Sequence, residues 1–102
     1  MNNFKRISTT DANELILRQS YLIDIRDQNS FNTEHMDNAI NLNDDNIEKF
    51  ILKADKKIPT IVYCYHGHSS QNAAQYLSSM GFTEVYSVDG GFEDWKNQLS
   101  SN

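Results

Sequence analysis

The sequence has 102 residues, enough for one domain that buries about 60 to 70% of its unfolded surface, and we expect that domain to cover residues 1–102. Its 14 acidic residues outnumber its 9 basic ones, for a formal net charge of −5, which argues against a nucleic-acid-binding surface of clustered Lys and Arg. No apolar stretch is long enough to span a membrane or to form a signal peptide, and the single cysteine can form no disulfide within the chain, so we expect a cytoplasmic protein.

The first half of the chain is predicted to alternate strands and helices. Ser8, followed three residues later by Asp11, is typical of a helix start, here of a helix that continues to Arg18. The short apolar run YLIDI is typical of a strand that is buried on both faces of a parallel sheet. In DDNIEKFILKA the apolar residues recur at spacings of three and four, which indicates an amphipathic helix. Before the cysteine we therefore expect strands at residues 4–7, 21–25, 39–42 and 60–64 and helices at residues 9–18, 28–33 and 44–54.

The second half begins with TIVYC, which is rich in the β-branched and aromatic residues that favour strands. A polar loop follows, and then a helix is predicted to begin near Ser70 and to end at Gly81, a residue type that commonly stops helices. We expect a last strand at residues 83–88 and a closing helix at residues 90–99. The residues predicted to face the core are Ala73, Ala74, Tyr76, Leu77 and Met80 in the first helix and Phe92, Trp95 and Leu99 in the second.

Strands separated by helices imply right-handed crossover connections and a mainly parallel sheet. We therefore expect an α/β fold whose mainly parallel, five-stranded sheet is flanked by helices on both faces. Ligands of such sheets gather beyond the carboxyl ends of the strands. Cys64 lies at that end of its predicted strand, so it is the first candidate for a functional residue.

The loop after Cys64 is suited to hold an anion. It must turn sharply within a few residues, and Gly67 supplies a position that readily takes a positive φ. Backbone N–H groups in such a turn point inward, and those in the first turn of the following helix have no partner within the helix. These amides would form a cradle with Cys64 at its floor and would favour the thiolate. The candidate binding residues are Tyr65, His66, Gly67, His68, Ser69 and Ser70.

Cationic side chains are scarce around this loop in the sequence. No arginine follows Arg26, and Lys96 is the only basic residue after Lys57. A cysteine phosphatase uses a similar loop but holds the phosphoryl dianion with an arginine fork, and the residue six positions after Cys64 is Ser70. The sequence therefore favours an anion held by backbone amides and argues against a phosphatase.

Two other interpretations of the cysteine stay open. A lone cysteine at the end of a strand is often a small buried hydrophobic residue, although such a residue needs no glycine or polar loop beside it. Alternatively, Cys64, His66 and His68 would share one side of an extended segment, and His35 would complete a set of four zinc ligands. We expect no metal, because the loop is predicted to turn rather than to extend, and we expect no cofactor.

Three segments resemble signatures of the rhodanese superfamily, in particular of its short single-domain thiosulfate sulfurtransferases. YLIDIRDQNSFNTEHMDNAINL is similar to the first signature, in which an Asp-x-Arg pair follows a strand. CYHGHSSQNAAQYL is similar to the active-site loop and its helix, and VYSVDGGFEDW to the closing signature. The resemblance covers essentially the whole chain, with Glu34 and Asn38 at positions where the family often has glycine.

The resemblance implies a two-step sulfur transfer. The thiolate of Cys64 would attack the outer sulfur of thiosulfate and become a persulfide, which then passes its sulfur to cyanide or to a thiol such as that of reduced thioredoxin. Asp24, Arg26, Asp27 and His35 are candidates for the rim of this site or for structural roles. A protein-to-protein sulfur carrier that uses the same cysteine stays an open alternative. We expect a monomer or weak dimer with no nucleic-acid or membrane partner.

Overall fold

The computed structural model describes residues 3–100, so the first two and last two residues of the expected domain lie outside the described residues. Over the described part, the chain forms one five-stranded sheet in the order β1-β5-β4-β2-β3, and all neighbouring strands are parallel. The strands are β1 (Lys5–Ile7), β2 (Tyr21–Asp24), β3 (Ile40–Asn41), β4 (Thr60–Tyr63) and β5 (Val85–Val88). The helices are α1 (Thr9–Leu15), α2 (Gln28–Thr33), α3 (Ile47–Lys53), α4 (Ser69–Ser79) and α5 (Gly91–Ser100). Within this described part, no helix has the length and apolar character needed to cross a membrane.

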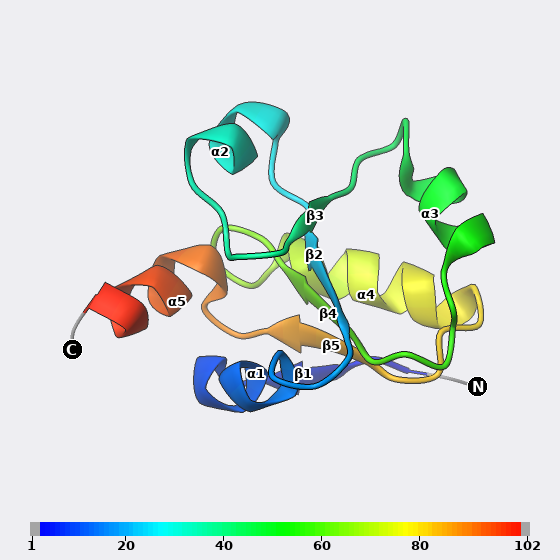
Figure 1. Ribbon diagram of the computed structural model, residues 1–102, viewed down its shortest axis with the longest axis horizontal. Helices are drawn as coiled ribbons and strands as arrows, with labels where there is room; N and C mark the ends of the chain where they lie inside the picture. The colour runs from blue at the N-terminus through cyan, green and yellow to red at the C-terminus, as the bar shows by residue number, and fades with distance from the viewer. Residues whose placement is uncertain (1–2, 101–102) are drawn as a thin grey trace.

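Helices cover both faces of the sheet, as the sequence predicted (Figure 1). Side chains alternate along β4, so Ile61 and Tyr63 point to one face while Val62 points to the other. The cluster on the α1 and α5 face consists of Ala12, Leu15, Leu22, Met36, Ile61, Tyr63, Val88, Phe92 and Trp95. The cluster on the α3 and α4 face consists of Ile23, Leu42, Ile51, Val62, Ala74, Leu77, Phe82 and Val85. The predicted α/β class and parallel sheet are confirmed.

The loops that follow β2 and β4 meet at the carboxyl-terminal end of the sheet. The register pairs Asp24 with Tyr63, the last residues of the two strands. The N–H of Ile25 then donates to the carbonyl oxygen of Tyr63 over 3.1 Å. Because α2 lies beyond the carboxyl end of β2 (Figure 1), it lies at the same end of the sheet as Cys64, which follows β4.

The first helix is shorter than the sequence predicted. Its start is as expected, since the hydroxyl oxygen of Ser8 accepts a hydrogen bond from the N–H of Asp11 over 3.0 Å. It ends at Leu15 rather than at Arg18, because the N–H groups of Leu17 and Arg18 bond to carbonyl oxygens three residues back. This tighter turn ends the helix and redirects the chain toward β2.

The third helix is also shorter at its start. It begins at Ile47 rather than at Asp44. The side-chain oxygen of Asn43 accepts hydrogen bonds from the N–H groups of Asp45 and Asn46, which holds this segment in a turn. All five strands lie within their predicted ranges, with Cys64 just outside the last residue of β4.

Three residues predicted to face the core are exposed instead, namely Tyr76 and Met80 of α4 and Leu99 of α5. The buried face of α4 consists of Ser70, Ala74, Leu77 and Ser78. The helical period was predicted correctly, but the buried stripe is rotated and includes Ser70 and Ser78, neither of which was predicted to face the core. Tyr76 instead donates its hydroxyl hydrogen to a carboxylate oxygen of Glu48 at the surface, 2.6 Å away.

Candidate active site

Cys64 lies at the junction between β4 and α4 and is only 4% exposed. Its sulfur accepts hydrogen bonds from the backbone N–H groups of Gly67 and Ser70, each at 3.2 Å. The hydroxyl oxygen of Ser70 lies 3.3 Å from the same sulfur. Inward-pointing donors therefore surround the sulfur, in the arrangement that the sequence predicted.

These surroundings change the pKa of the thiol. Burial by itself raises the pKa of Cys64, because it removes water from the charged form. The hydroxyl of Ser70 and the backbone N–H groups of Ser70, Gly67 and His66 outweigh this effect, so the pKa of Cys64 lies below its ordinary value. The sulfur therefore carries more thiolate at neutral pH, and the thiolate is the nucleophilic form.

Gly67 makes the turn of the loop possible. Its φ of 95° lies in the left-handed region that side chains other than hydrogen disfavour. A Cβ at this position would also lie 2.8 Å from the backbone nitrogen of Gly90, so no room exists for one. Gly67 was predicted for its backbone freedom, and it is also needed because the loop lies close to the backbone of Gly90.

Gly91, at the start of α5, is a functional position that the sequence reasoning missed. Its φ is 61°, and a Cβ there would lie 2.6 Å from both the carbonyl oxygen of Cys64 and the backbone nitrogen of His66. The signal that could have found it is the Gly90–Gly91 pair at the start of the predicted closing helix, at a place where serine, threonine, aspartate or asparagine is the usual cap.

The first turn of α5 packs against the loop after Cys64 and is hydrogen-bonded to it. The N–H of Phe92 donates to the carbonyl oxygen of Cys64 over 2.7 Å, and the N–H of Glu93 donates to that of Tyr65 over 3.1 Å. These bonds satisfy N–H groups that have no partner within α5. They also hold the two loop carbonyls against α5, which leaves the loop amides facing the sulfur.

Tyr65 fastens the loop to α2. Its hydroxyl contacts the hydroxyl of Ser30 at 2.6 Å and donates to the carboxylate of Asp27, the residue that caps α2. The hydrogen bonds to Tyr65 and Ser30, in that order of size, lower the pKa of Asp27 to about 2. Asp27 was predicted, with Asp24 and Arg26, to lie at the rim of the site or to have a structural role, whereas Ser30 was not singled out. The contact between Tyr65 and Asp27 was not predicted, because it joins segments that are 38 residues apart.

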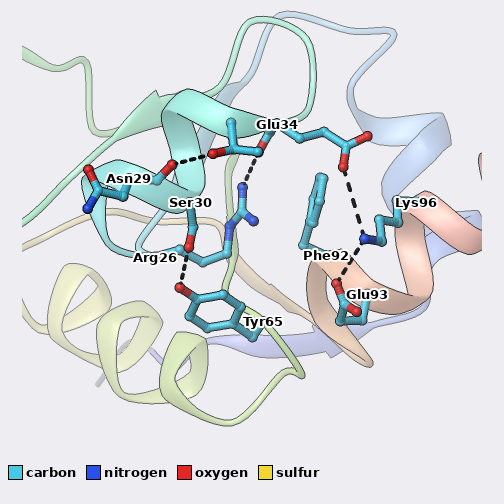
Figure 2. A pocket seen from close by; sticks show the side chains of 9 residues that line it. Arg26, Asn29, Ser30, Glu34, Tyr65, Phe92, Glu93 and Lys96 are labelled. Atoms are coloured by element: carbon cyan, nitrogen blue, oxygen red, sulfur yellow. Dashed lines mark hydrogen bonds and ion pairs between the residues drawn. The ribbon is translucent and has the colours of Figure 1, made fainter.

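Asp24 and Arg26 form a buried ion pair behind the loop, with side chains 0% and 4% exposed. The Nη2 of Arg26 lies 2.8 Å from Oδ2 of Asp24, and it also donates to the carbonyl oxygen of Glu34 over 2.6 Å. Figure 2 shows the guanidinium beside Tyr65 and Phe92, whose ring centroids lie 5.6 Å and 4.1 Å from its central carbon. Arg26 thus joins the end of β2 to the end of α2, and its charge is already paired.

The histidines occupy different places. His66 and His68 are exposed beside the sulfur, at a hollow of about 130 Å³. The residues around this hollow are Cys64, Tyr65, His66, His68 and Ser69. His35 lies outside it, with Nδ1 2.7 Å from the carbonyl oxygen of Phe31 and its ring stacked on that phenyl ring. Among residues 3–100, no group of three or more His, Cys, Asp and Glu side chains is arranged to hold a metal ion.

Comparisons with known proteins agree with one another. The family model described as a rhodanese-like domain matches residues 8–98. A protein of Shewanella oneidensis named thiosulfate sulfurtransferase GlpE is 51% identical over 96 residues, which cover 93% of this chain and 95% of the relative. A protein of the same name from Ectopseudomonas mendocina is 49% identical over 101 residues, which cover 99% of this chain and 93% of the relative. The crystal structure of a rhodanese-related protein from Thermoplasma volcanium matches with a TM-score of 0.79 at 24% identity and covers 93% of each chain.

Proposed function

The chain belongs to the family of rhodanese-like domains, and on this premise we propose that it is a thiosulfate sulfurtransferase that works through a persulfide on Cys64. Relatives that carry this activity in their name are 51% and 49% identical to it over nearly their whole length. The observation that supports the proposal most is the sulfur of Cys64, which accepts two backbone hydrogen bonds at 3.2 Å and faces a hydroxyl at 3.3 Å. A buried thiol kept only for packing needs no such donors.

In the first half-reaction, the thiolate of Cys64 attacks the outer sulfur of thiosulfate. A bond forms between Sγ and that sulfur, the S–S bond of thiosulfate breaks, and sulfite leaves with the bonding electron pair. The outer sulfur of the persulfide keeps the negative charge that it carried in thiosulfate. No proton moves when Cys64 is already ionised, so the step requires no general base from His66 or His68.

In the second half-reaction, an acceptor attacks the outer sulfur of the persulfide. Cyanide takes this sulfur and leaves as thiocyanate, while Cys64 returns to the thiolate. A thiol acceptor, such as that of reduced thioredoxin, takes the sulfur as its own thiolate and becomes a persulfide in turn. The two half-reactions share only the sulfur-loaded protein, which makes the kinetics ping-pong.

Backbone amides, rather than cationic side chains, stabilise the charges of this reaction. Arg26 lies behind the loop and is paired with Asp24, and no later arginine exists in the sequence. The N–H groups of Gly67 and Ser70 already point at the sulfur. Fixed donors of this kind need no reorganisation as charge develops, and a single one contributes about 100-fold or more to the rate. Without an arginine fork, the site is poorly suited to phosphate esters.

We propose one domain for the whole chain. Residues 1–102 form a single rhodanese-like domain, which agrees with a family match over residues 8–98. This domain acts in the cytoplasm as a monomer or weak dimer and uses no cofactor. Its partners are thiosulfate and the sulfur acceptor.

Intact-mass spectrometry tests the proposal. Incubation with thiosulfate should add the mass of one sulfur atom to the wild-type protein and none to Cys64→Ser. Cyanide should then restore the original mass and release thiocyanate. Turnover by Cys64→Ser would show that the nucleophile is assigned wrongly. If the wild type took sulfur only from a persulfidated partner protein and never from thiosulfate, the sulfur-carrier hypothesis would replace this one.

A further inference from the structure

Ser87 is a polar residue inside an apolar layer. The register pairs it with Val62, so its side chain points to the face that α4 covers, and it is 0% exposed. Strand positions under a packed helix are normally apolar. A buried hydroxyl destabilises a fold unless it is hydrogen-bonded. Ser87 therefore needs a polar partner on the α4 side of the sheet.

That partner is Ser70, whose hydroxyl faces the sulfur of Cys64. The hydroxyl oxygens of Ser87 and Ser70 lie 2.8 Å apart, and Ser70 is also 0% exposed. From the hydroxyl oxygen of Ser70 to the sulfur of Cys64 the distance is 3.3 Å. The three side chains therefore form a continuous hydrogen-bonded chain that runs from β5 through α4 to the sulfur.

Building on the sulfurtransferase function proposed above, we propose that Ser87 is a positioning residue that directs the hydroxyl hydrogen of Ser70 toward the sulfur of Cys64. A serine hydroxyl donates one hydrogen bond and accepts two. When Ser87 donates to Ser70, the single hydrogen of Ser70 remains for the sulfur. Without Ser87, the hydrogen of the Ser70 hydroxyl turns more freely toward other acceptors, such as the carbonyl oxygens of the preceding turn, to which serine side chains can donate.

The donor-to-acceptor direction of the hydrogen bonds among Cys64, Ser70 and Ser87 depends on whether the sulfur is charged. A protonated Cys64 donates to Ser70, which donates to Ser87, whereas an ionised Cys64 accepts from Ser70, which accepts from Ser87. Both hydroxyls are fully buried, so their hydrogen bonds act in a low dielectric. The pair thus adapts to either state by rotation of two hydroxyl hydrogens.

The thiolate matters twice in the cycle. Cys64 attacks as a thiolate in the first half-reaction and departs as a thiolate in the second. A leaving thiol of lower pKa departs faster, whereas an attacking thiol of lower pKa is less nucleophilic. We therefore expect the hydrogen bond from Ser70, as directed by Ser87, to benefit mainly the transfer of sulfur to the acceptor.

The rate at which iodoacetamide alkylates Cys64, measured against pH, tests the proposal without any sulfur substrate. Ser87→Ala should move the midpoint of this profile to higher pH. The shift should be about 0.5 to 1 pH unit, the effect of weakening one hydrogen bond to a charged group. Below the midpoint, alkylation should be about two- to fourfold slower, because the smaller thiolate fraction is partly offset by the higher nucleophilicity of a more basic thiolate. Ser87→Thr, which keeps a hydroxyl on a side chain suited to strands, should restore the wild-type profile.

Ser78→Ala is the matched control. Ser78 is a buried serine of the same helix, about 12 Å along α4 from Ser70, and within the described residues its hydroxyl has no hydrogen-bond partner. Its removal deletes a buried hydroxyl that is not connected to the sulfur. The alkylation profile of Ser78→Ala should match that of the wild type.

A double-mutant cycle decides whether Ser87 acts through Ser70. In a Ser70→Ala background, adding Ser87→Ala should change the profile no further. An equal shift in both backgrounds, or an unchanged profile in Ser87→Ala, would overturn the proposal. If Ser87→Ala does not fold, the isosteric pair Ser87→Thr and Ser87→Val makes the same comparison. A shifted profile in a protein that takes no sulfur from thiosulfate would reject the proposed function and leave the positioning role standing.

Discussion

The backbone N–H of Phe92 donates to the carbonyl oxygen of Cys64 over 2.7 Å, so the helix that closes the chain supports the loop of the candidate nucleophile. Gly91 precedes this contact and lies directly beneath the loop. The loop is therefore shaped from three sides, by β4 before it, by α4 after it and by the start of α5 below it. Its geometry depends on residues far away in the sequence.

Gly91→Ala should abolish most sulfur transfer while the protein stays folded. Alanine at a φ of 61° costs about 1–2 kcal/mol, and its Cβ would lie 2.6 Å from the carbonyl oxygen of Cys64. The loop must then move, and a displacement of its donors by about 1 Å lowers the rate of thiocyanate formation by about 100-fold. The rate is measured on samples that circular dichroism shows to be folded.

Gly81→Ala is the control for this change. Gly81 also has a positive φ, of 103°, but a Cβ there would meet only side-chain carbons of Lys56. This variant should lose stability and keep wild-type activity. Equal activity in Gly81→Ala and Gly91→Ala would contradict the supporting role of α5.

Tyr65→Phe should loosen the loop and change the titration of Asp27. The variant loses the hydrogen bonds to Asp27 and Ser30 but keeps the ring beside Arg26. Because Tyr65 is the largest cause of the low pKa of Asp27, that pKa should rise from about 2 toward its ordinary value, as measured by NMR titration. The kcat/KM for thiosulfate should fall by about two- to threefold, the lower end of the effect of one hydrogen bond.

Tyr76→Phe provides the comparison for Tyr65→Phe. It removes another exposed tyrosine–carboxylate hydrogen bond, the one to Glu48 on α3, which lies away from the loop. Neither the kcat/KM nor the pKa of Asp27 should change in this variant. An Asp27 pKa that stayed at about 2 in Tyr65→Phe would mean that Tyr65 does not fasten the loop.

Local contacts explain why much of the site could be predicted from the sequence. The N–H groups of Gly67 and Ser70 reach Cys64 because a sharp turn and a helix start leave them few other partners. The α/β fold could be predicted from the alternation of strands and helices.

Asn38 occupies a position where the family often has glycine. Its φ is 68°, a conformation that asparagine tolerates better than most residues.

Contacts between distant segments could not be predicted. No local pattern connects Tyr65 with Asp27, or Gly91 with the loop, because those contacts depend on how the strands are ordered in the sheet. The buried stripe of α4 was misplaced for a related reason. Ser70 and Ser78 are buried because of what they face, whereas only apolar and aromatic residues were predicted for the buried face.

Arg26→Ala should destabilise the fold strongly, because it leaves the carboxylate of Asp24 buried without its partner. Breaking a buried pair in this way costs about 3–5 kcal/mol of unfolding free energy. The control is Arg6→Ala, which breaks the exposed pair between Arg6 and Asp89 and should cost about 0–1 kcal/mol. Urea unfolding measures both values. Similar losses in the two variants would contradict a structural role for the buried pair.

The reactivity of wild-type Cys64 should rise with pH and level off at a lower pH than that of an ordinary thiol. Donors that favour the thiolate lower the pKa of Cys64, so the midpoint of alkylation should lie below that of the same cysteine in the unfolded chain. An unfolded sample in urea supplies the reference profile. A folded midpoint at or above the unfolded one would mean that burial outweighs the hydrogen bonds.

The covalent role of Cys64 is tested most directly by rapid mixing of the protein with thiosulfate in the absence of any acceptor. We predict a fast release of one sulfite per Cys64, followed by no further sulfite until cyanide or a thiol is added. Cys64→Ser should release none. Sulfite that appeared only after the acceptor was added, or that Cys64→Ser also released, would contradict a persulfide on Cys64 as the intermediate.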